Sequence, residues 1–369
     1  MAAPDRDNIL NSLNELQDPD LGQGLVDLDM IRDLQIDEGV QLRLVLMTPA
    51  SPLREGLVRD IKEKLAGLGI SDPKIEVDAE VPRAAQPASN SPMADRLPGV
   101  KAVLCIASGK GGVGKSTVAS NVAIALSQLG CKVGLLDADI YGPSMPTMLG
   151  LTEARPQATA DGQGIEPLER YGVKVMSMGF MMKQEDAVIW RGPMLGKALQ
   201  QFIEDVAWGE LDYLVLDMPP GTGDVQLSLS QLLPVAGAVV VTTPQDVAFA
   251  DVHRAIKMFE TTRTHVLGLV ENMSHFTCGQ CGANHAIFGD GNIEQHAADH
   301  SLEVLGRLPL DSVTAVAADQ GQPISVAAPD SSMGQAYREL AQTVARKLAL
   351  RAVTASRPAF ENFFQMKQA

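Results

Sequence analysis

The first part of the chain combines helical and extended hydrophobic patterns. Apolar residues recur at helical spacing in two segments and alternate with polar residues in three others. This mixture predicts a small α/β module over residues 1–81, with an antiparallel sheet because two of its strands follow each other across a short turn. The expected helices span residues 7–17 and 52–68, and the expected strands span residues 28–36, 40–47 and 74–81.

The hydrophobic pattern stops at residues 82–98 and then resumes in a different form. Residues 82–98 are rich in Pro, Ala and Ser and have no apolar periodicity, as is typical of a flexible linker. Beyond them, continuous apolar runs such as 103–107 and 211–216 alternate with helical patterns. This alternation predicts an α/β domain over residues 99–351, with a mostly parallel sheet and helices on both faces. We expect a C-terminal tail over residues 352–369.

A glycine-rich loop follows the first apolar run of this domain. The loop has the sequence GKGGVGKST and leads into a helical stretch, which is the context of a phosphate-binding loop. Glycines let successive backbone N–H groups face a phosphate chain, and the helix N-terminus adds partial positive charge. Lys115 is expected to reach the β- and γ-phosphates of ATP, and the Ser116 hydroxyl is expected to bind Mg²⁺. The candidate nucleotide-binding residues here are Gly109, Lys110, Gly111, Gly112, Val113, Gly114, Lys115, Ser116 and Thr117.

Lys110 is a second lysine in this loop, and the general pattern does not require it. A second cation near the γ-phosphate can neutralise charge that develops during phosphoryl transfer. One short loop can hardly aim both lysines at the same phosphate, so we expect Lys110 to be catalytic across a subunit interface. ATP would then promote a homodimer. The alternative is a solvated surface lysine.

Acidic residues end two of the apolar runs in this domain. Asp137 and Asp139 follow the strand predicted over 133–136, and residues two apart in an extended chain project to the same side. Asp217 closes another strand and precedes the turn Pro-Pro-Gly-Thr-Gly, an arrangement that orients Mg²⁺ beside a phosphate loop. Asp137, Asp217 and Ser116 are therefore candidate Mg²⁺ ligands, direct or through water.

An asparagine stands at the expected end of a later strand. Asn272 follows the strand predicted over residues 266–271, at the edge of the sheet where ligands of open α/β folds bind. Its amide can donate and accept together, as recognition of an adenine edge requires. A turn-forming asparagine is the alternative.

Two of the four cysteines lie in the sequence Cys-Gly-Gln-Cys-Gly. The glycine after Cys278 and the one after Cys281 let backbone N–H groups approach the sulfurs, which suits metal thiolates. Three interpretations stay open: a redox pair, a zinc site completed by His275 or His285, and half of a four-thiolate site completed by a second subunit. The third interpretation favours a [4Fe–4S] cluster shared by a homodimer, since two thiolates cannot saturate a cluster.

The composition narrows the range of partners. A formal net charge of −15 disfavours both nucleic acid and anionic membrane surfaces as partners. No apolar run approaches the length of a bilayer span, and the first residues do not form a signal peptide. We therefore expect a cytoplasmic protein without a nucleic-acid or membrane partner.

Taken together, the motifs resemble those of the Mrp/ApbC family of iron–sulfur cluster carrier ATPases, in the MinD/ParA group of P-loop proteins with a deviant Walker A motif. The resemblance covers residues 100–350 and depends on GKGGVGKST, LLDADIYGPS, YLVLDMPPGTGD, and ENMS followed by CGQCG. It implies ATP hydrolysis, with Asp139 polarising the attacking water and Asn272 reading adenine. We expect this hydrolysis to be slow, since no motif in the sequence indicates an arginine finger. It also implies that Cys278 and Cys281 bind a [4Fe–4S] cluster, which comes from a scaffold or donor protein and passes to apo-proteins.

The N-terminal module resembles the small iron–sulfur assembly domain that is often fused to such ATPases. That family often has a cysteine in a Thr-Pro-x-Cys-Pro turn, whereas this chain has Ser51 at the corresponding position. Serine is a poor ligand for soft metals, so we assign no cluster to this module and expect a docking role.

The expected function is therefore that of an ATP-dependent iron–sulfur cluster carrier. A positioning ATPase of the MinD/ParA kind is one alternative, and it predicts a basic amphipathic helix or a basic patch. A zinc-bridged P-loop ATPase dimer is the other alternative. A small-molecule kinase would need an acceptor pocket and a lid, and the sequence indicates neither.

Overall fold

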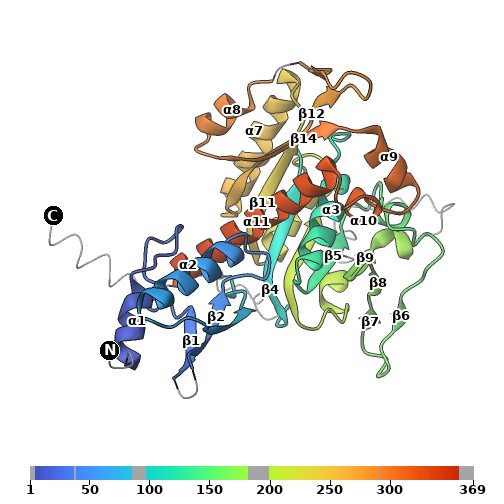
Figure 1. The fold of residues 1–369 in the computed structure, drawn as a ribbon. Coiled ribbons are helices and arrows are strands. Elements are labelled where there is room, and N and C mark those ends of the chain that lie inside the picture. Colours follow the sequence, from blue (N-terminus) through green and yellow to red (C-terminus); the bar gives the residue numbers. More distant parts are fainter. Residues whose placement is uncertain (1–4, 37–38, 85–96, 182–198, 290, 357–369) are drawn as a thin grey trace. The chain divides into compact units, whose positions relative to one another are not determined.

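The computed structural model divides the chain into two compact units (Figure 1). One unit groups residues up to Pro82 with residues from Ala345 onward, and the other spans Arg83–Val344. Most of the predicted linker and of the predicted tail lies outside the described residues. The structure describes residues 5–36, 39–84, 97–181, 199–289 and 291–356.

The small unit is an α/β module with a three-stranded sheet in the order β1-β2-β3. Strands β1 and β2 are antiparallel, but β2 and β3 are parallel, so the expectation of an antiparallel sheet was wrong. The reason is helix α2, which connects β2 to β3 as a crossover and returns the chain to the same end of the sheet. The elements are α1 (Arg6–Asn14), β1 (Ile31–Gln35), β2 (Gln41–Leu46), α2 (Arg54–Gly67) and β3 (Lys74–Ala79).

Apolar faces of these elements form one core. Helix α1 buries Ile9 and Leu13, and helix α2 buries Leu57, Ile61 and Leu65 at helical spacing. The sheet adds further buried residues from β1 and β2 to the same cluster. The module therefore has a hydrophobic core of its own.

The larger unit is built on a nine-stranded sheet with the order β13-β12-β11-β4-β10-β5-β9-β8, and β14 pairs with β12. The pairs among β4, β5, β9, β10, β11, β12 and β14 are parallel, while β8 and β13 are antiparallel to their neighbours. This confirms the predicted mostly parallel sheet. The strands are β4 (Val100–Ala107), β5 (Val133–Asp137), β8 (Leu168–Arg170), β9 (Val173–Ser177), β10 (Leu211–Asp217), β11 (Val235–Thr242), β12 (Val266–Thr277), β13 (Asn284–His285) and β14 (Val304–Leu310).

Helices cover this sheet. Helix α3 packs against β4, β5 and β10, α7 packs against β11, and α8 packs against β12 and β14 (Figure 1). Within the described part of the chain, no helix is both long and apolar enough to cross a bilayer. The helices of this unit are α3 (Lys115–Gln128), α4 (Met145–Met148), α6 (Asp224–Leu232), α7 (Asp246–Thr261), α8 (Ile293–Asp299), α9 (Ser312–Asp319) and α10 (Ile324–Ala327), and α11 (Ser332–Ser356) begins in it. A short ribbon of β6 (Gln157–Ala158) and β7 (Ile165–Glu166) and a 3-10 helix, η2 (Met178–Phe180), complete the fold.

The order of the strands brings the predicted site residues to one edge. Strand β10 lies between β4 and β5, and its register pairs Asp217 with Ile106 on one side and with Asp137 on the other. All three strands are parallel, so their carboxyl ends meet at the start of the glycine-rich loop.

Candidate functional site

The glycine-rich loop connects β4 to α3, as predicted. Gly114 is the N-cap of α3, and the helix begins at Lys115. Gly112 and Gly114 adopt φ angles of 78° and 81°, a left-handed conformation that glycine tolerates without strain. The loop therefore presents backbone N–H groups and the positive end of a helix of 14 residues to the same point, which is an anion-binding geometry.

Lys115 is buried at this point and forms an ion pair with Asp217. Its Nζ atom lies 2.5 Å from Asp217 Oδ1, and it also donates to the Ser116 hydroxyl over 3.2 Å. The second carboxylate oxygen of Asp217 is buried and has no hydrogen-bond partner among the described residues. Two adjacent oxygens, one on Asp217 and one on Ser116, are therefore available as hard ligands beside the lysine.

Asp137 contributes a second buried carboxylate. It accepts hydrogen bonds from the Ser177 hydroxyl (2.9 Å) and from the backbone N–H groups of Asp139 (3.1 Å) and Met145 (3.2 Å). Burial, and then the charge of Asp217, raise the pKa of Asp137 to about 7. Such like-charge repulsion between buried carboxylates is relieved by a cation, so the donor set suits Mg²⁺.

Asp139 and Lys110 are less buried than the carboxylates of Asp137 and Asp217. Asp139 is half-buried, and its carboxylate accepts from the N–H of Gly142 over 3.2 Å. Its charge contributes to raising the pKa of Asp217, although burial is the main cause and the Lys115 ammonium opposes it. Lys110 is also half-buried and donates to Gln245 Oε1 over 3.1 Å.

Asn272 contacts the glycine-rich loop directly. Its side-chain nitrogen donates to the Val113 carbonyl oxygen over 2.8 Å, and the side chain is buried. The strand that contains it extends to Thr277, beyond the predicted end at residue 271, because β13 pairs with its last residues. Asn272 is thus inside a strand and supports the shape of the loop.

The cysteine pair lies at the tip of the β12–β13 hairpin. The Cys278 N–H donates to the Ala283 carbonyl, and the Gly282 N–H donates to the Cys278 carbonyl, which closes a tight loop. Backbone N–H groups of Cys281 and then Gln280 approach the Cys278 sulfur and lower its pKa. Both thiols are free, Cys278 half-buried and Cys281 exposed. A hairpin tip lacks the helix N-terminus of a redox pair.

The zinc interpretation needs further ligands close to the two sulfurs. Among the residues that the structure describes, no three His, Cys, Asp or Glu side chains gather as a metal site. His275 and His285 therefore do not complete a mononuclear zinc site with the two cysteines in this chain. Among the described residues, the hairpin therefore offers two thiols and no third metal ligand beside them.

The family model described as the NUBPL iron-transfer P-loop NTPase matches residues 99–345. The chain belongs to this family. A model described as an iron–sulfur cluster assembly protein matches residues 6–77, which cover most of the small module. The predicted resemblance to iron–sulfur carrier ATPases is confirmed, and this iron-transfer P-loop NTPase is accordingly an ATPase.

Two of the relatives of this iron-transfer NTPase match nearly its whole length. The iron–sulfur cluster carrier protein of Synechocystis is 46% identical over 352 residues, covering 94% of this chain and 99% of the relative. The carrier protein of Deinococcus radiodurans is 46% identical over 350 residues, with 94% and 97% covered. A solved nucleotide-binding protein from Archaeoglobus fulgidus, in complex with ADP, is 39% identical with a TM-score of 0.56, covering 64% of this chain and 93% of that one.

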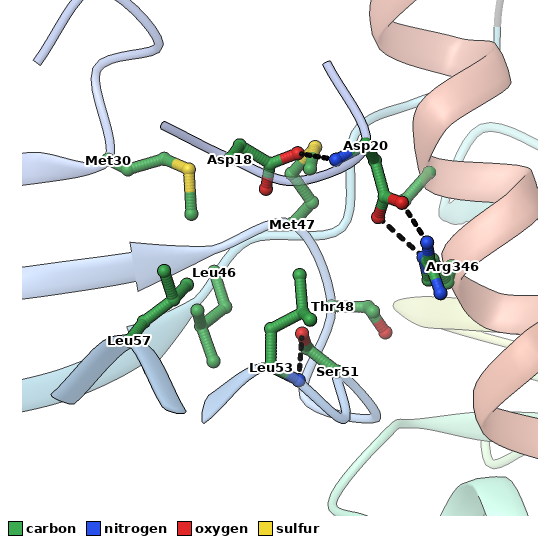
Figure 2. Close-up of a pocket in the computed structure, with 11 residues that line it drawn as sticks. Asp18, Asp20, Met30, Leu46, Met47, Thr48, Ser51, Leu53, Leu57 and Arg346 are labelled. Atoms are coloured by element: carbon green, nitrogen blue, oxygen red, sulfur yellow. Dashed lines mark hydrogen bonds and ion pairs between the residues drawn. The ribbon is translucent and has the colours of Figure 1, made fainter. Parts of the chain in front are cut away.

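The turn around Ser51 in the small module lines a cavity with room for about one water molecule (Figure 2). Asp18 lines the same cavity, and its Oδ1 accepts from the N–H groups of Asp20 and Leu21, while its buried Oδ2 has no partner among the described residues. Arg346 forms an ion pair with Asp20 beside it.

Two polar residues near the site were not predicted from the sequence. Ser177 donates to the Asp137 carboxylate, and Gln245 accepts from Lys110. Ser177 is the last residue of β9, and Gln245 follows the end of β11 by three residues. A polar residue at such a strand end was the only signal that could have identified them.

Proposed function

We propose that this iron-transfer NTPase works as a homodimer that holds a [4Fe–4S] cluster between two Cys278/Cys281 hairpins and changes the exposure of that cluster through its ATP cycle. The observation that supports the proposal most directly is the isolated thiol pair. Two thiols at a hairpin tip, with no third metal ligand beside them among the described residues, need further ligands from outside the chain to hold a metal centre. A second copy supplies two more thiolates through twofold symmetry.

The nucleotide site is the glycine-rich loop with Lys115, and the residues around it fit a magnesium ion. The free Asp217 Oδ2, the Ser116 hydroxyl and the buried Asp137 carboxylate are hard oxygen donors, as Mg²⁺ requires. When bound, Mg²⁺ offsets negative charge on the β- and γ-phosphates. Lys115 binds phosphate oxygens, and the N–H groups at the start of α3 orient them.

Two further residues have separate roles in hydrolysis. Asp139 is half-buried beside the buried carboxylates, where it can accept a hydrogen bond from the attacking water. Lys110 binds Gln245, whereas Lys115 binds Asp217, and these separate partners support a role for Lys110 at the γ-phosphate of the partner subunit. Asn272 supports the loop and is adjacent to the expected position of the adenine.

The lowered pKa of Cys278 favours the thiolate that binds iron. Its causes are backbone N–H groups, which also stabilise the charge of sulfur ligands in a bound cluster. The proposed clients are apo-proteins that require a cluster, and the proposed source is a scaffold or donor protein. The formal net charge of −15 argues against a nucleic-acid partner.

The test is anaerobic reconstitution of the full-length protein with iron and sulfide, followed by iron, sulfide and zinc analysis. We expect about four iron atoms per dimer, which is one [4Fe–4S] cluster. The double variant Cys278→Ala/Cys281→Ala should retain almost none, whereas Cys105→Ala, which alters a buried thiol, is the matched control. Full iron content in the double variant would refute the proposal, and stoichiometric zinc would favour the zinc-bridged dimer.

A further inference from the structure

Gln245, the residue before α7, receives two hydrogen bonds at one oxygen atom. The Lys110 ammonium donates to Oε1 over 3.1 Å, and the Thr243 hydroxyl donates to the same atom over 3.3 Å. The ammonium of Lys110 can only donate, so this contact requires the oxygen end of the Gln245 amide to face it. Gln245 is therefore a pre-oriented acceptor for Lys110.

The loop is further constrained on the side that faces α7. A Cβ atom on Gly109 would lie 2.3 Å from the carbonyl oxygen of Asp251, so the residue before Lys110 packs directly on the helix backbone. The Lys110 backbone carbonyl accepts from the Ser108 hydroxyl over 2.9 Å. With its main chain held in this way, Lys110 can change its partner only by a movement of its side chain.

We infer that the hydrogen bond between Lys110 and Gln245 retains Lys110 within its own subunit and opposes formation of the catalytic dimer. We call this hydrogen bond the latch. The inference rests on the proposed function, in which Lys110 acts on the γ-phosphate of the partner. A lysine bound to its own Gln245 has to give up that hydrogen bond before it crosses the interface. Gln245 touches no reacting atom, so it is a positioning residue that acts through Lys110.

The same turn contacts the segment that follows the cysteine hairpin. A Cβ atom on Gly291 would lie 2.5 Å from the carbonyl oxygen of Pro244, which shows how closely the two backbones approach. Pro244 and Gly291 also line one cavity with His275 of β12 and Asn284 of β13. We therefore expect release of Lys110 from Gln245 to perturb a turn that packs against the segment after the hairpin and lines a cavity together with residues of β12 and β13.

The experiment measures ATPase rate as a function of protein concentration for the full-length protein. Formation of each dimer breaks two of these hydrogen bonds, one in each subunit, so Gln245→Ala should lower the concentration for half-maximal specific activity by on the order of thirtyfold. Gln245→Glu should raise that concentration, because a carboxylate binds the ammonium more strongly than an amide does. Thr243→Val removes only the second donor and should cause a smaller shift in the direction of Gln245→Ala.

The decisive control repeats the Gln245 substitutions in a Lys110→Ala background and follows ATP-dependent dimerisation by analytical ultracentrifugation, because loss of Lys110 itself impairs turnover. The inference requires that the Gln245 substitutions leave the concentration dependence unchanged in this background, because residue 245 then has no lysine to bind. If the midpoint concentration still shifts without Lys110, the inference is overturned, since the shift would then come from a structural effect of residue 245. Turnover in Gln245→Ala that falls as far as in Lys110→Ala also overturns it, because Gln245 would then present the lysine instead of retaining it.

A second measurement tests the connection to the hairpin. With the reconstituted protein, a ferrous chelator should remove iron in the presence of ATP several-fold faster from Gln245→Ala than from the unmodified chain. Equal rates would overturn the connection to the hairpin. The ATPase measurement does not depend on iron. A wrong cluster assignment would appear in the iron content of the cysteine variants, whereas a wrong role for Gln245 would appear in the ATPase measurement.

Discussion

Loss of the Lys115 charge should destabilise the protein even without nucleotide, because Lys115 compensates a fully buried carboxylate. Asp217 is 0% exposed and Lys115 is 6% exposed, with 2.5 Å between Nζ and Oδ1. An effective dielectric constant of about 20 gives roughly 7 kcal/mol of attraction at that distance, which desolvation of both groups partly offsets. Removing one partner of such a pair costs about 3–5 kcal/mol, since the other charge stays buried.

The perturbation is Lys115→Met, which keeps the length of the side chain and removes its charge. For a unit of this size, a loss of that magnitude lowers Tm by on the order of 10 °C. The matched variant Lys115→Met/Asp217→Asn removes both charges and should recover most of the loss. The assay is thermal unfolding followed by circular dichroism, in buffer with EDTA and no nucleotide, so that neither magnesium nor ATP compensates the charge.

The effect should also depend on pH. Burial raises the pKa of Asp217, and Lys115 is the strongest influence that lowers it, so the variant has a still higher pKa in the folded state. Between the unfolded and folded pKa values the folded protein holds the extra proton, and its stability therefore falls as pH rises through that window. Lys115→Met should lose more stability at pH 8 than at pH 5. Equal losses at both values, or no recovery with Asp217→Asn, would refute this reasoning.

Three further predictions concern the loop and the hairpin. Gly114→Ala should abolish ATP binding in an equilibrium titration, because the residue has a φ of 81° and its Cβ would lie 2.2 Å from the Asn272 amide nitrogen. Asn272→Ala should weaken ATP binding by about tenfold through loss of the Val113 hydrogen bond. A matching loss for GTP would show that Asn272 supports the loop without reading adenine. In reduced, iron-free protein, alkylation of Cys278 should reach half its maximal rate at a lower pH than alkylation of free cysteine, as mass spectrometry of the peptide would show.

Much of the site could be predicted because its components are local in the sequence. A phosphate-binding loop is a contiguous run of residues, and its strand and helix flanks are adjacent to it. Asp137 and Asp217 were identifiable because each closes a continuous apolar run, and parallel strands bring such ends to one edge. The cysteine pair was identifiable by its spacing alone, although the spacing left its ligand open.

Contacts between residues far apart in the chain were decided only by the tertiary structure. Lys110 meets Gln245 across 135 residues, and Asn272 meets Val113 across 159. The hydrophobic periodicity of the sequence does not predict such contacts, because they depend on which strands become neighbours in the sheet and on the register between those strands. The parallel pairing of β2 with β3 is of the same kind, since alternation of apolar residues defines the face of a strand but not its direction.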